Sequence, residues 1–400
     1  MKNIRWGIGA VCCMAILLSP SAGHARVSCR ATFDASAGTL TIQSVSVGSA
    51  RYQVTMALEG NYVFSLVDAT VLNSADCYDS AIYASEVVTI PDVKAGDDYY
   101  YADLTLVPGS NPMRFALRSA IKNPRLVPEA AIRVNNASNP FATVAVDGTA
   151  YVGYSDLASG EGGTKFQSSA DGLRFGNPTV LTYSNRSVDS RRTLMPDGVT
   201  WRFYEYNQTT ASMTSYSSTD GNSFTADSGV RYAPHASDNN TIGVYDHYTA
   251  SDGSVVMIYV GDLTGKNNLR MARSTDNGLT FTFLKGNVLG DDDAGGGGST
   301  FIDNKTILLP DGRRRMFAMR SFELYSFIST DGVNWTREPG VRVSYTDFAA
   351  AGLTIYSLND PVPVSTIDGV CRVYVAAATS STAMTPGSSD WAIVSAVWRE

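Results

Sequence analysis

Cysteine and histidine are scarce in this chain, which has five cysteines and three histidines among 400 residues. Three of the cysteines follow Ala25, and no two of these are close in the sequence. A structural zinc site needs about four clustered cysteine or histidine ligands, so the composition argues against one. No nucleotide-binding or haem-binding signature occurs either. In an oxidising compartment, Cys29 and Cys77 are the candidate disulfide pair.

Positive charge is limited as well. The sequence has 31 basic and 38 acidic residues, which gives a net charge of −7. The basic residues are scattered, and the longest basic run is the arginine triplet at 313–315. A nucleic-acid-binding protein needs a basic face that neutralises phosphates. We therefore expect no nucleic-acid partner.

Long apolar runs are absent except near the start of the chain. There, Lys2 and Arg5 precede an apolar stretch from Trp6 to Leu18, and small residues follow as far as Ala25. The stretch is shorter than the roughly 20 residues that a membrane span needs. The pattern predicts a signal peptide over residues 1–25, with export to the periplasm or the extracellular space and no membrane span.

Two systems of internal repeats follow the predicted signal peptide. In the first, the segment Leu40–Gly48 recurs as Val88–Gly96, and each copy continues into strands with alternating apolar residues. Alternation with a period of two indicates β-strands. We expect residues 26–122 to form a small β-domain of two similar halves, which serves as a spacer or a docking module.

The second system of repeats fills residues 123–400. Five Asp-Gly pairs lie at nearly regular spacing between strand-like runs, at 147–148, 197–198, 252–253, 311–312 and 368–369. Such pairs favour tight hairpins because both residues tolerate positive φ. A hairpin that recurs at this regular interval is typical of propeller blades, each of which is a four-stranded sheet. The sequence thus predicts an all-β protein with a five-bladed β-propeller, whose last blade is completed by the segment at about 114–134.

A second turn with a common sequence follows four of these hairpins. Its pattern is Ser-x-Asp, then glycine, then an aromatic residue, and the copy that begins at Ser274 is the fullest. Aspartate and serine side chains bond the backbone of such a turn, and glycine permits the reversal. We predict that four aspartates have a structural role on the face away from the axial pocket: Asp171, Asp220, Asp276 and Asp331.

Acidic residues recur at the start of the innermost strand of the repeats. Counting back eight residues from each hairpin aspartate reaches an aspartate in the second, fourth and fifth repeats, and Asn139 in the first. In the third repeat, Asp246 stands two residues beyond the corresponding position. Inner strands line the axis, so these side chains are expected to converge on one mouth. Two glutamates at the expected ends of the second strands of their blades join this set. The candidate catalytic residues are Asp189, Asp246, Asp303, Asp360, Glu205 and Glu323.

Polar and aromatic residues near the same mouth are candidates for substrate binding. They are Asn139, Tyr204, Tyr206, His235, His247 and Asp262. A separate loop, Asp291-Asp292-Asp293 followed by alanine and four glycines, offers three carboxylates. Oxygen ligands of this kind suit calcium, whereas a solvated glycine-rich loop without metal is an equally good interpretation. The inner-strand aspartates have an alternative interpretation as well: they could serve only to form turns during folding, because aspartate before proline is an ordinary turn residue.

The four Ser-x-Asp turns resemble the Asp box, or BNR repeat, of sialidase-like propellers. The inner-strand aspartate, the aliphatic run and the Pro-Asp-Gly turn resemble the five-bladed arabinanases and furanosidases. In that family, one inner-strand aspartate is the base, a second tunes the pKa and a glutamate is the acid. The resemblance implies a glycoside hydrolase that acts on carbohydrate through a carboxylate pair.

Two alternatives accompany this resemblance. Sialidases have six blades, an early Arg-Ile-Pro segment and an arginine triad, so a six-bladed sialidase-like propeller is the alternative fold; no Arg-Ile-Pro segment occurs here. Asn139 stands where the furanosidase pattern leads us to expect an aspartate. A non-catalytic propeller that binds a carbohydrate or a protein is therefore the alternative function.

Overall fold

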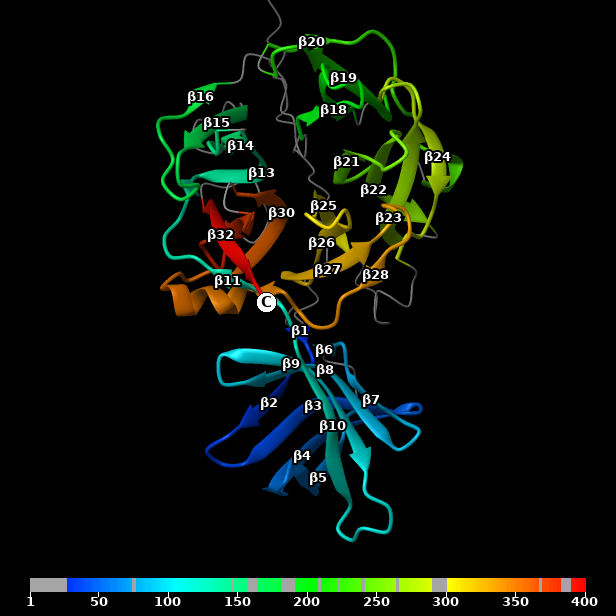
Figure 1. Cartoon of the computed structure of the whole chain (residues 1–400), viewed down its shortest axis with the longest axis vertical. Helices are drawn as coiled ribbons and strands as arrows, with labels where there is room; N and C mark the ends of the chain where they lie inside the picture. Colours follow the sequence, from blue (N-terminus) through cyan, green and yellow to red (C-terminus); the bar gives the residue numbers. More distant parts are fainter. Residues whose placement is uncertain are drawn as a thin grey trace, which may run out of the picture.

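The computed structural model describes residues 27–73, 77–145, 147–156, 164–180, 191–207, 210–221, 223–238, 242–263, 266–289, 301–366, 369–382 and 390–400. The predicted signal peptide lies outside these residues. Figure 1 shows two parts: strands β1 to β10 form one body, and strands β11 to β32 form a ring of sheets. No helix in the described part of the chain is long and apolar enough to cross a membrane.

The N-terminal part is a closed, barrel-like sheet of two similar halves. Its strands pair in the order β2-β3-β4-β5-β10-β9-β8-β7, and parallel pairings of β2 with β8 and of β3 with β7 close it. Its strands are β2 (Ala31–Asp34), β3 (Thr39–Val47), β4 (Ala50–Gly60), β5 (Val63–Val71), β7 (Ala81–Ala84), β8 (Val87–Ala95), β9 (Asp98–Leu106) and β10 (Arg114–Lys122). A separate parallel pair consists of β1 (Val27–Ser28) and β6 (Cys77–Tyr78).

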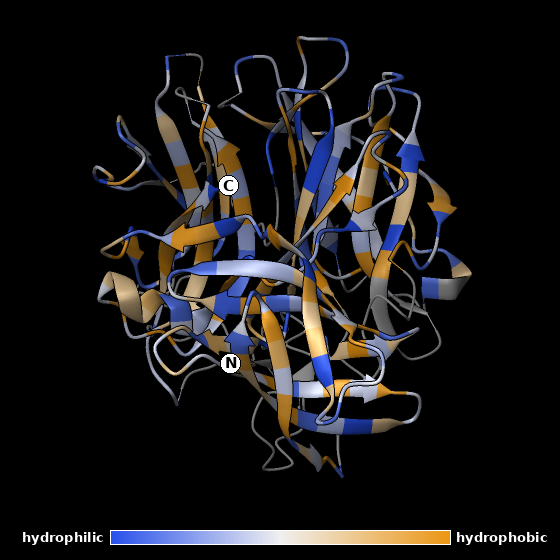
Figure 2. Ribbon diagram, turned by 60° about the horizontal axis from the view of Figure 1, so that its bottom comes forward, coloured by the Kyte–Doolittle hydropathy of each residue, from blue (hydrophilic) through white to orange (hydrophobic). Residues whose placement is uncertain are grey.

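The internal repeat explains this topology. Strands β2 to β5 correspond to β7 to β10, so the β2–β8 pairing has its counterpart in the β7–β3 pairing. Alternate residues point inward from equivalent strands: Leu40 and Ile42 from β3, and Val88 and Ile90 from β8, belong to one buried cluster. The hydropathy colours in Figure 2 alternate along many strands in the same way.

The ring consists of five sheets, which confirms the predicted five-bladed propeller. Blade one is β13 (Ala137–Val144), β14 (Ala150–Asp156), β15 (Thr164–Ser169) and β16 (Thr179–Val180). Blade two is β17 (Thr193–Leu194), β18 (Trp201–Asn207), β19 (Ser212–Ser218) and β20 (Thr225–Ala226). Blade three is β21 (Tyr245–Thr249), β22 (Val255–Leu263), β23 (Lys266–Ser274) and β24 (Thr282–Lys285), preceded by the short 3-10 helix η1 (Ala236–Asp238).

Blades four and five complete the ring. Blade four is β25 (Ile302–Leu308), β26 (Arg314–Arg320), β27 (Glu323–Ser329), β28 (Thr336–Arg337) and the short β29 (Val343–Ser344). Blade five is β30 (Ser357–Ser365), β31 (Cys371–Ala378) and β32 (Trp391–Arg399). It is completed by β11 (Arg125–Pro128) and β12 (Val134–Asn135), which pair antiparallel with β32.

The completing segment begins later than predicted. The expected range of about 114–134 includes β10, but β10 pairs with β5 and β9 in the barrel. Phe115 of β10 is 3% exposed and packs in the barrel core. Because the phenyl ring of Phe115 is buried inside the barrel, β10 belongs to the barrel and not to the propeller. Strands β11 and β12 therefore complete blade five and close the propeller.

The four Ser-x-Asp turns lie at the same end of their blades as the Asp-Gly hairpins. In each blade, the serine of the turn pairs with the first residue of the second strand: Ala150 with Ser169, Trp201 with Ser218, Val255 with Ser274 and Arg314 with Ser329. The turns are therefore at the end of the blade opposite to the start of its inner strand. Their aspartates accept hydrogen bonds from the serine hydroxyl at 2.6 to 3.0 Å.

These turns are expected to make stability depend on acid pH. Hydrogen bonds from the backbone of Arg174 and Leu173 lower the pKa of Asp171 to about 2. Partial burial works against ionisation of Asp276, but hydrogen bonds led by Thr280 lower its pKa to about 2. Because these folded-state values lie below the unfolded value near 3.9, the stabilisation is complete above about pH 4 and is lost as the pH falls towards 2.

The measurement is the melting temperature between pH 6 and pH 2. The double variant Asp171→Asn with Asp276→Asn should melt lower than wild type at pH 6 and should lose less stability on acidification. Asp68→Asn, which changes an exposed carboxylate on β5, is the control and should follow wild type. An acid-induced loss in the double variant as large as in wild type would contradict the expectation.

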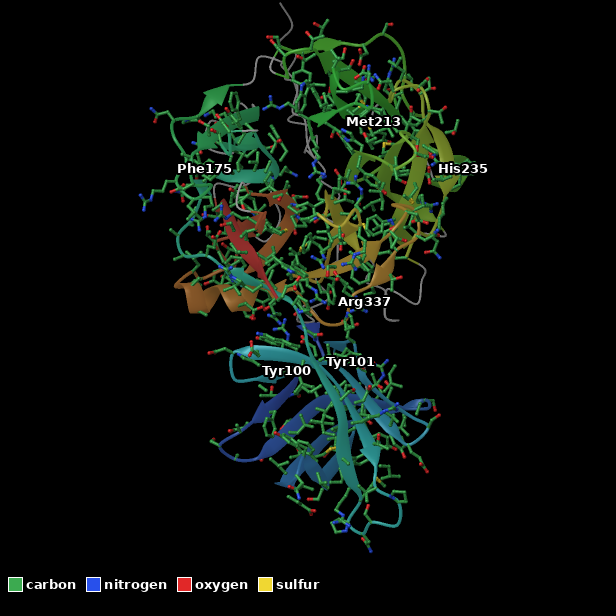
Figure 3. The ribbon with its side chains drawn as sticks, in the orientation of Figure 1. Tyr100, Tyr101, Phe175, Met213, His235 and Arg337 are labelled. Carbon is green, nitrogen blue, oxygen red and sulfur yellow. The ribbon has the colours of Figure 1, made fainter. Side chains whose placement is uncertain are left out.

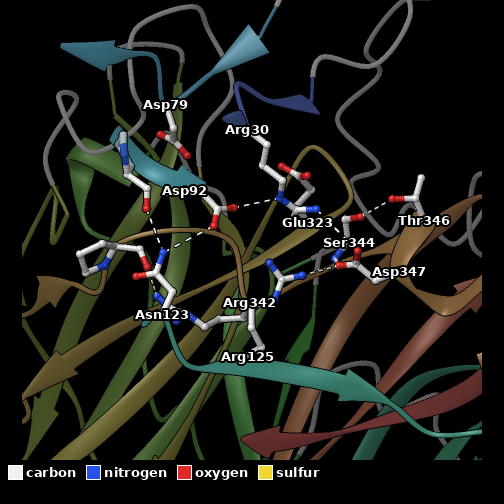
Figure 4. A network of polar contacts seen from close by, with 12 residues as sticks. Arg30, Asp79, Asp92, Asn123, Arg125, Glu323, Arg342, Ser344, Thr346 and Asp347 are labelled. Atoms are coloured by element: carbon white, nitrogen blue, oxygen red, sulfur yellow. Dashed lines mark hydrogen bonds and ion pairs between the residues drawn. The ribbon is translucent and has the colours of Figure 1, made fainter. Parts of the chain in front are cut away.

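One ion pair, between Arg30 and Asp347, and one cation–π contact, between Arg125 and Tyr99, join the barrel to the propeller in the network of Figure 4. Arg30 binds Asp92 at 2.9 Å and approaches Asp347 of the 3-10 helix η3 (Tyr345–Ala351) at 3.6 Å. Arg125 binds the second oxygen of Asp347 at 2.7 Å, and its guanidinium lies 3.5 Å from the ring centre of Tyr99. The barrel is thus fixed to the rim of the propeller by charged side chains that are mostly shielded from water.

A second set of ion pairs centres on Asp79. This carboxylate binds Arg337 of β28 at 2.5 Å and lies 3.7 Å from Arg320 at the end of β26. Figure 3 shows Arg337 at the boundary between the two parts. Burial opposes ionisation of Asp79, but the charges of Arg337 and Arg320, together with hydrogen bonds from Arg337 and Tyr325, outweigh burial and lower its pKa. Two arginines of blade four therefore bind one carboxylate of the N-terminal part.

Candidate functional site

Three inner strands begin with the same unusual backbone conformation. Asn139, Asp303 and Asp360 have φ values of 49°, 54° and 51°, in the left-handed region. Each lies at a shift of register between the inner strand and its neighbour, in blades one, four and five. Asparagine and aspartate tolerate this conformation better than most residues, because their short polar side chains bond locally. Equivalent bulges thus place a polar side chain at the start of three inner strands.

These three residues meet at the axis, and we call them the mouth cluster. The Asn139 Nδ2 donates a hydrogen bond to Asp360 Oδ2 at 3.2 Å. The backbone N–H of Asp360 donates to Asp303 Oδ2 at 3.4 Å. The residues are 5%, 3% and 3% exposed in chain order. The structure therefore brings together two of the predicted catalytic aspartates and the asparagine of blade one.

The mouth cluster is fixed further by Ser138, a residue that the sequence analysis did not identify. Its hydroxyl donates to Asn139 Oδ1 at 2.8 Å. This bond settles the orientation of the amide, since the carbonyl oxygen accepts from Ser138 and the nitrogen donates to Asp360. An amide held in this way presents a donor to the carboxylate of blade five.

Asp246 lies in a different set of contacts. Both of its oxygens accept from Arg191 Nη1, at 3.1 and 3.2 Å, and Oδ2 also accepts from the backbone N–H and the hydroxyl of Thr306 at 2.7 and 2.8 Å. Asp246 is fully buried. Burial opposes its ionisation, but the charges of Arg191 and Lys305 outweigh burial and hold its pKa below the usual value. We call Arg191, Asp246 and Thr306 the axial plug.

Arg191 ties four blades together through this plug. It precedes β17 of blade two and binds Asp246 of blade three, and it donates to the carbonyl oxygens of Thr306 in blade four and Pro363 in blade five, at 2.9 and 3.4 Å. The sequence analysis missed Arg191 as part of the axis. Its position two residues after Asp189 was the available signal.

Most of the predicted binding residues do not reach the mouth cluster. Tyr204 is completely buried, and its hydroxyl donates to Gly278 O of blade three at 3.0 Å. His247 is buried with its ring 4.6 Å from that of Tyr204, and burial lowers its pKa to about 3, so it is neutral. Tyr206 packs against the same core at its edge. These side chains hold blades two and three together.

His235 and Glu205 are placed elsewhere on blades two and three. His235 is exposed and stacks on Phe283 with 4.2 Å between the ring centres. Figure 3 shows it at the outer edge of the ring, far from the axis. Glu205 lies in β18 opposite Thr214 of β19 and is half-buried.

Glu323 lies beside the barrel. It begins β27 and accepts a hydrogen bond from Tyr325 Oη at 3.0 Å. Figure 4 shows it next to Arg30 in the network between the two parts, and its charge raises the pKa of that arginine, together with the larger effects of Asp92 and Asp347. The structure does not bring it into the mouth cluster.

Several predictions fall on parts of the chain that the structure does not describe. Asp189 and the carboxylate loop Asp291-Asp292-Asp293 lie outside the described residues, as does the side chain of Asp262. In the described part, no cluster of three potential metal ligands is present. Cys29 is disulfide-bonded. The side chain of Cys77 is not described, although its backbone pairs with Val27 of β1, so the pairing of the two cysteines stays a prediction.

Comparisons with known proteins identify the fold. The chain matches no known family model and no curated protein. A thermostable family-43 glycoside hydrolase resembles it with a TM-score of 0.50 and 10% identity, over 68% of this chain and 92% of that one. The α-L-arabinofuranosidase from Lactobacillus brevis also gives 0.50 and 10%, over 66% and 91%. At such low identity, the likeness shows that this chain has a five-bladed propeller fold of the kind found in glycoside hydrolases.

Proposed function

We propose that this protein is an exported glycoside hydrolase that cleaves a carbohydrate at the axial mouth of its propeller. Asp303 and Asp360 are the reacting carboxylates, and Asn139 positions Asp360. Export follows from the signal peptide predicted over residues 1–25. The observation that carries the proposal is the convergence of two aspartates and one asparagine from separate blades on one point of the axis.

The chemistry of glycoside hydrolysis fits this pair. One carboxylic acid protonates the leaving oxygen, and one carboxylate activates water or attacks the sugar. Asp303 and Asp360 each come from the start of an inner strand, where a sugar entering along the axis would meet them. Both occupy left-handed bulges, a conformation that costs energy and is often kept at functional sites.

Asp246 has a supporting role in this proposal. Its two oxygens are engaged by Arg191 and Thr306, so it is poorly placed to exchange a proton with substrate. The four Ser-x-Asp turns that resemble the Asp box account for blade architecture and take no part in the reaction. Within the likeness to sialidase-like and furanosidase-like propellers, the five blades and the absence of an Arg-Ile-Pro segment favour the furanosidase type.

A second candidate function rests on Asn139. An amide cannot act as a general base, and here it occupies the blade-one position that the furanosidase resemblance assigns to an acid. If that position is essential, the propeller binds a glycan without cleaving it. The hydrogen bond from Asn139 to Asp360 would then orient a carboxylate that accepts bonds from sugar hydroxyls.

The test uses the mature protein with arabinosyl, xylosyl, fructosyl and sialyl substrates. Release of free sugar from at least one of them is the expected result. Calorimetric binding of a substrate without release favours the glycan-binding function, and in that case Asn139→Asp should gain slow hydrolysis. Neither release nor binding across the panel would overturn both proposals.

A further inference from the structure

A cavity of about 380 Å³ lies on the axis beneath the axial plug. It is lined by the later residues of all five inner strands: 142–144, 193–194, 247–249, 306–308 and 363–365. These residues run towards the Asp-Gly hairpins, so the cavity belongs to the end of the propeller opposite to the mouth cluster. Its volume lies in the range of pockets that bind small molecules. We call it the lower cavity.

The ionisable groups around the lower cavity are of one sign. Arg191, Arg192 and Arg314 line it, and no carboxylate does so within the described chain. Two other ionisable residues line it and are both neutral: burial lowers the pKa of His247 to about 3 and raises the pKa of the Tyr248 hydroxyl. Asp246 lies behind the wall and balances one guanidinium, that of Arg191. The described lining of this open cavity therefore carries more positive than negative charge.

Arg314 is the guanidinium best placed to bind a ligand. It lies over the ring of Tyr248, 4.3 Å from its centre, and donates one hydrogen bond to the carbonyl oxygen of Thr249 at 3.0 Å. These contacts fix the plane of the guanidinium, and a guanidinium has five N–H donors in total. A planar group with several donors binds the two oxygens of a phosphate, sulfate or carboxylate in a fork.

The rest of the wall suits a ligand of monosaccharide size. Hydroxyl-bearing residues Thr143, Thr193 and Ser365 line the cavity together with Trp201. Hydroxyls bond sugar hydroxyls or the remaining oxygens of an anion, and an indole ring packs against the apolar face of a sugar. We propose that the lower cavity is a second binding site, which takes an oxyanion such as phosphate, sulfate or the carboxylate of a sugar acid.

This site is separate from the mouth cluster. Thr306 follows Asp303 by three residues of β25, beyond the bulge, and so lies at a lower level of the same strand. The side chains of the axial plug fill the axis between the two levels, and Asp246 is fully buried there. A ligand in the lower cavity therefore meets arginines, whereas a ligand at the mouth meets aspartates. Anion binding at the lower cavity does not depend on whether the mouth hydrolyses sugars.

The test is titration of the mature protein with inorganic phosphate, sulfate and D-glucuronate, followed by calorimetry and tryptophan fluorescence. D-Glucose is the neutral control. Saturable binding of at least one anion is expected, with no binding of glucose. Tighter binding of glucuronate than of phosphate identifies a sugar acid as the ligand, and the reverse order identifies a free inorganic anion.

Single-residue variants test whether the anion binds in the lower cavity. Arg314→Gln should weaken anion binding by about tenfold or more, because a charged hydrogen bond to the anion is lost. Arg313→Gln is the matched control: this neighbouring arginine is exposed and paired with Asp311, so it should bind as wild type does. Trp201→Phe should retain binding and lose most of the fluorescence change.

Three results would overturn the proposal. The first is the absence of saturable binding of any of the three anions at low ionic strength. The second is equal weakening by Arg313→Gln and Arg314→Gln, which would place the anion on the surface. The third is an unchanged affinity in Arg314→Gln, with circular dichroism and melting showing that the variant is folded.

Discussion

Replacing Asp360 with asparagine is expected to lower kcat on the cleaved sugar by about 10²-fold or more, since a positioned acid or base contributes roughly 10² to 10⁴ to the rate. The amide has nearly the same shape as the carboxylate. Its oxygen can still accept the hydrogen bond that Asn139 Nδ2 donates at 3.2 Å. The variant should therefore fold normally and lose the carboxyl group that exchanges a proton in the proposed hydrolysis.

Asp303→Asn should have an effect of similar size, because the proposed hydrolysis uses both carboxyl groups. Asp68→Asn, at an exposed position of β5 in the barrel, is the control and should retain full activity. The measurement is the initial rate of sugar release, with the melting temperature recorded for each variant. Activity close to wild type in both mouth variants would remove Asp303 and Asp360 from the reaction.

The number of blades could be predicted from the sequence because it depends on local turns. Each blade contains one Asp-Gly hairpin, and glycine at positions such as 253 and 312 has the positive φ of 79° and 84° that the hairpin requires. The number of such turns therefore gives the number of blades, even when the packing of the blades is unknown. Internal similarity at a fixed offset likewise predicted the two halves of the barrel, since equivalent sequences form equivalent strands.

The site was predictable only where local sequence determines it. Asn139, Asp303 and Asp360 all stand at the same distance from the Asp-Gly hairpin of their blade, and Asn139 and Asp360 each precede a proline. The positions of all three bulges could therefore be recognised in the sequence. Asp246 was assigned to the same ring by its proximity to that position. It has no bulge, however, and its side chain lies at the level of Thr306, below the mouth.

Contacts between segments far apart in the sequence could not be predicted from the repeats. Arg191 reaches blades three, four and five only because the ring closes around it. Glu323 was predicted at the mouth from its place at the end of a strand, yet it lies beside Arg30 because the barrel docks on blade four. The spacing of hairpins contains no information on where another part of the chain binds.

Asp246→Asn is expected to lower the free energy of unfolding by about 3 kcal/mol, the lower end of the range for removing one partner of a buried ion pair. The amide can still accept a hydrogen bond from the backbone of Thr306, but it cannot balance the charge of Arg191. That guanidinium is 17% exposed and would remain at the axis without its counter-charge. The measurement is urea unfolding at pH 7, followed by tryptophan fluorescence.

A double variant separates the missing charge from a loss of packing. If uncompensated charge causes the loss, Arg191→Met combined with Asp246→Asn should recover a large part of the stability, because no unpaired ion is left inside the propeller. Asp311→Asn, which changes an exposed pair with Arg313, is the control and should unfold at nearly the same urea concentration as wild type. A double variant less stable than Asp246→Asn would contradict this explanation. It would mean that Arg191 stabilises the axis mainly through its hydrogen bonds to the backbone carbonyl oxygens of Thr306 and Pro363, and less through the ion pair with Asp246.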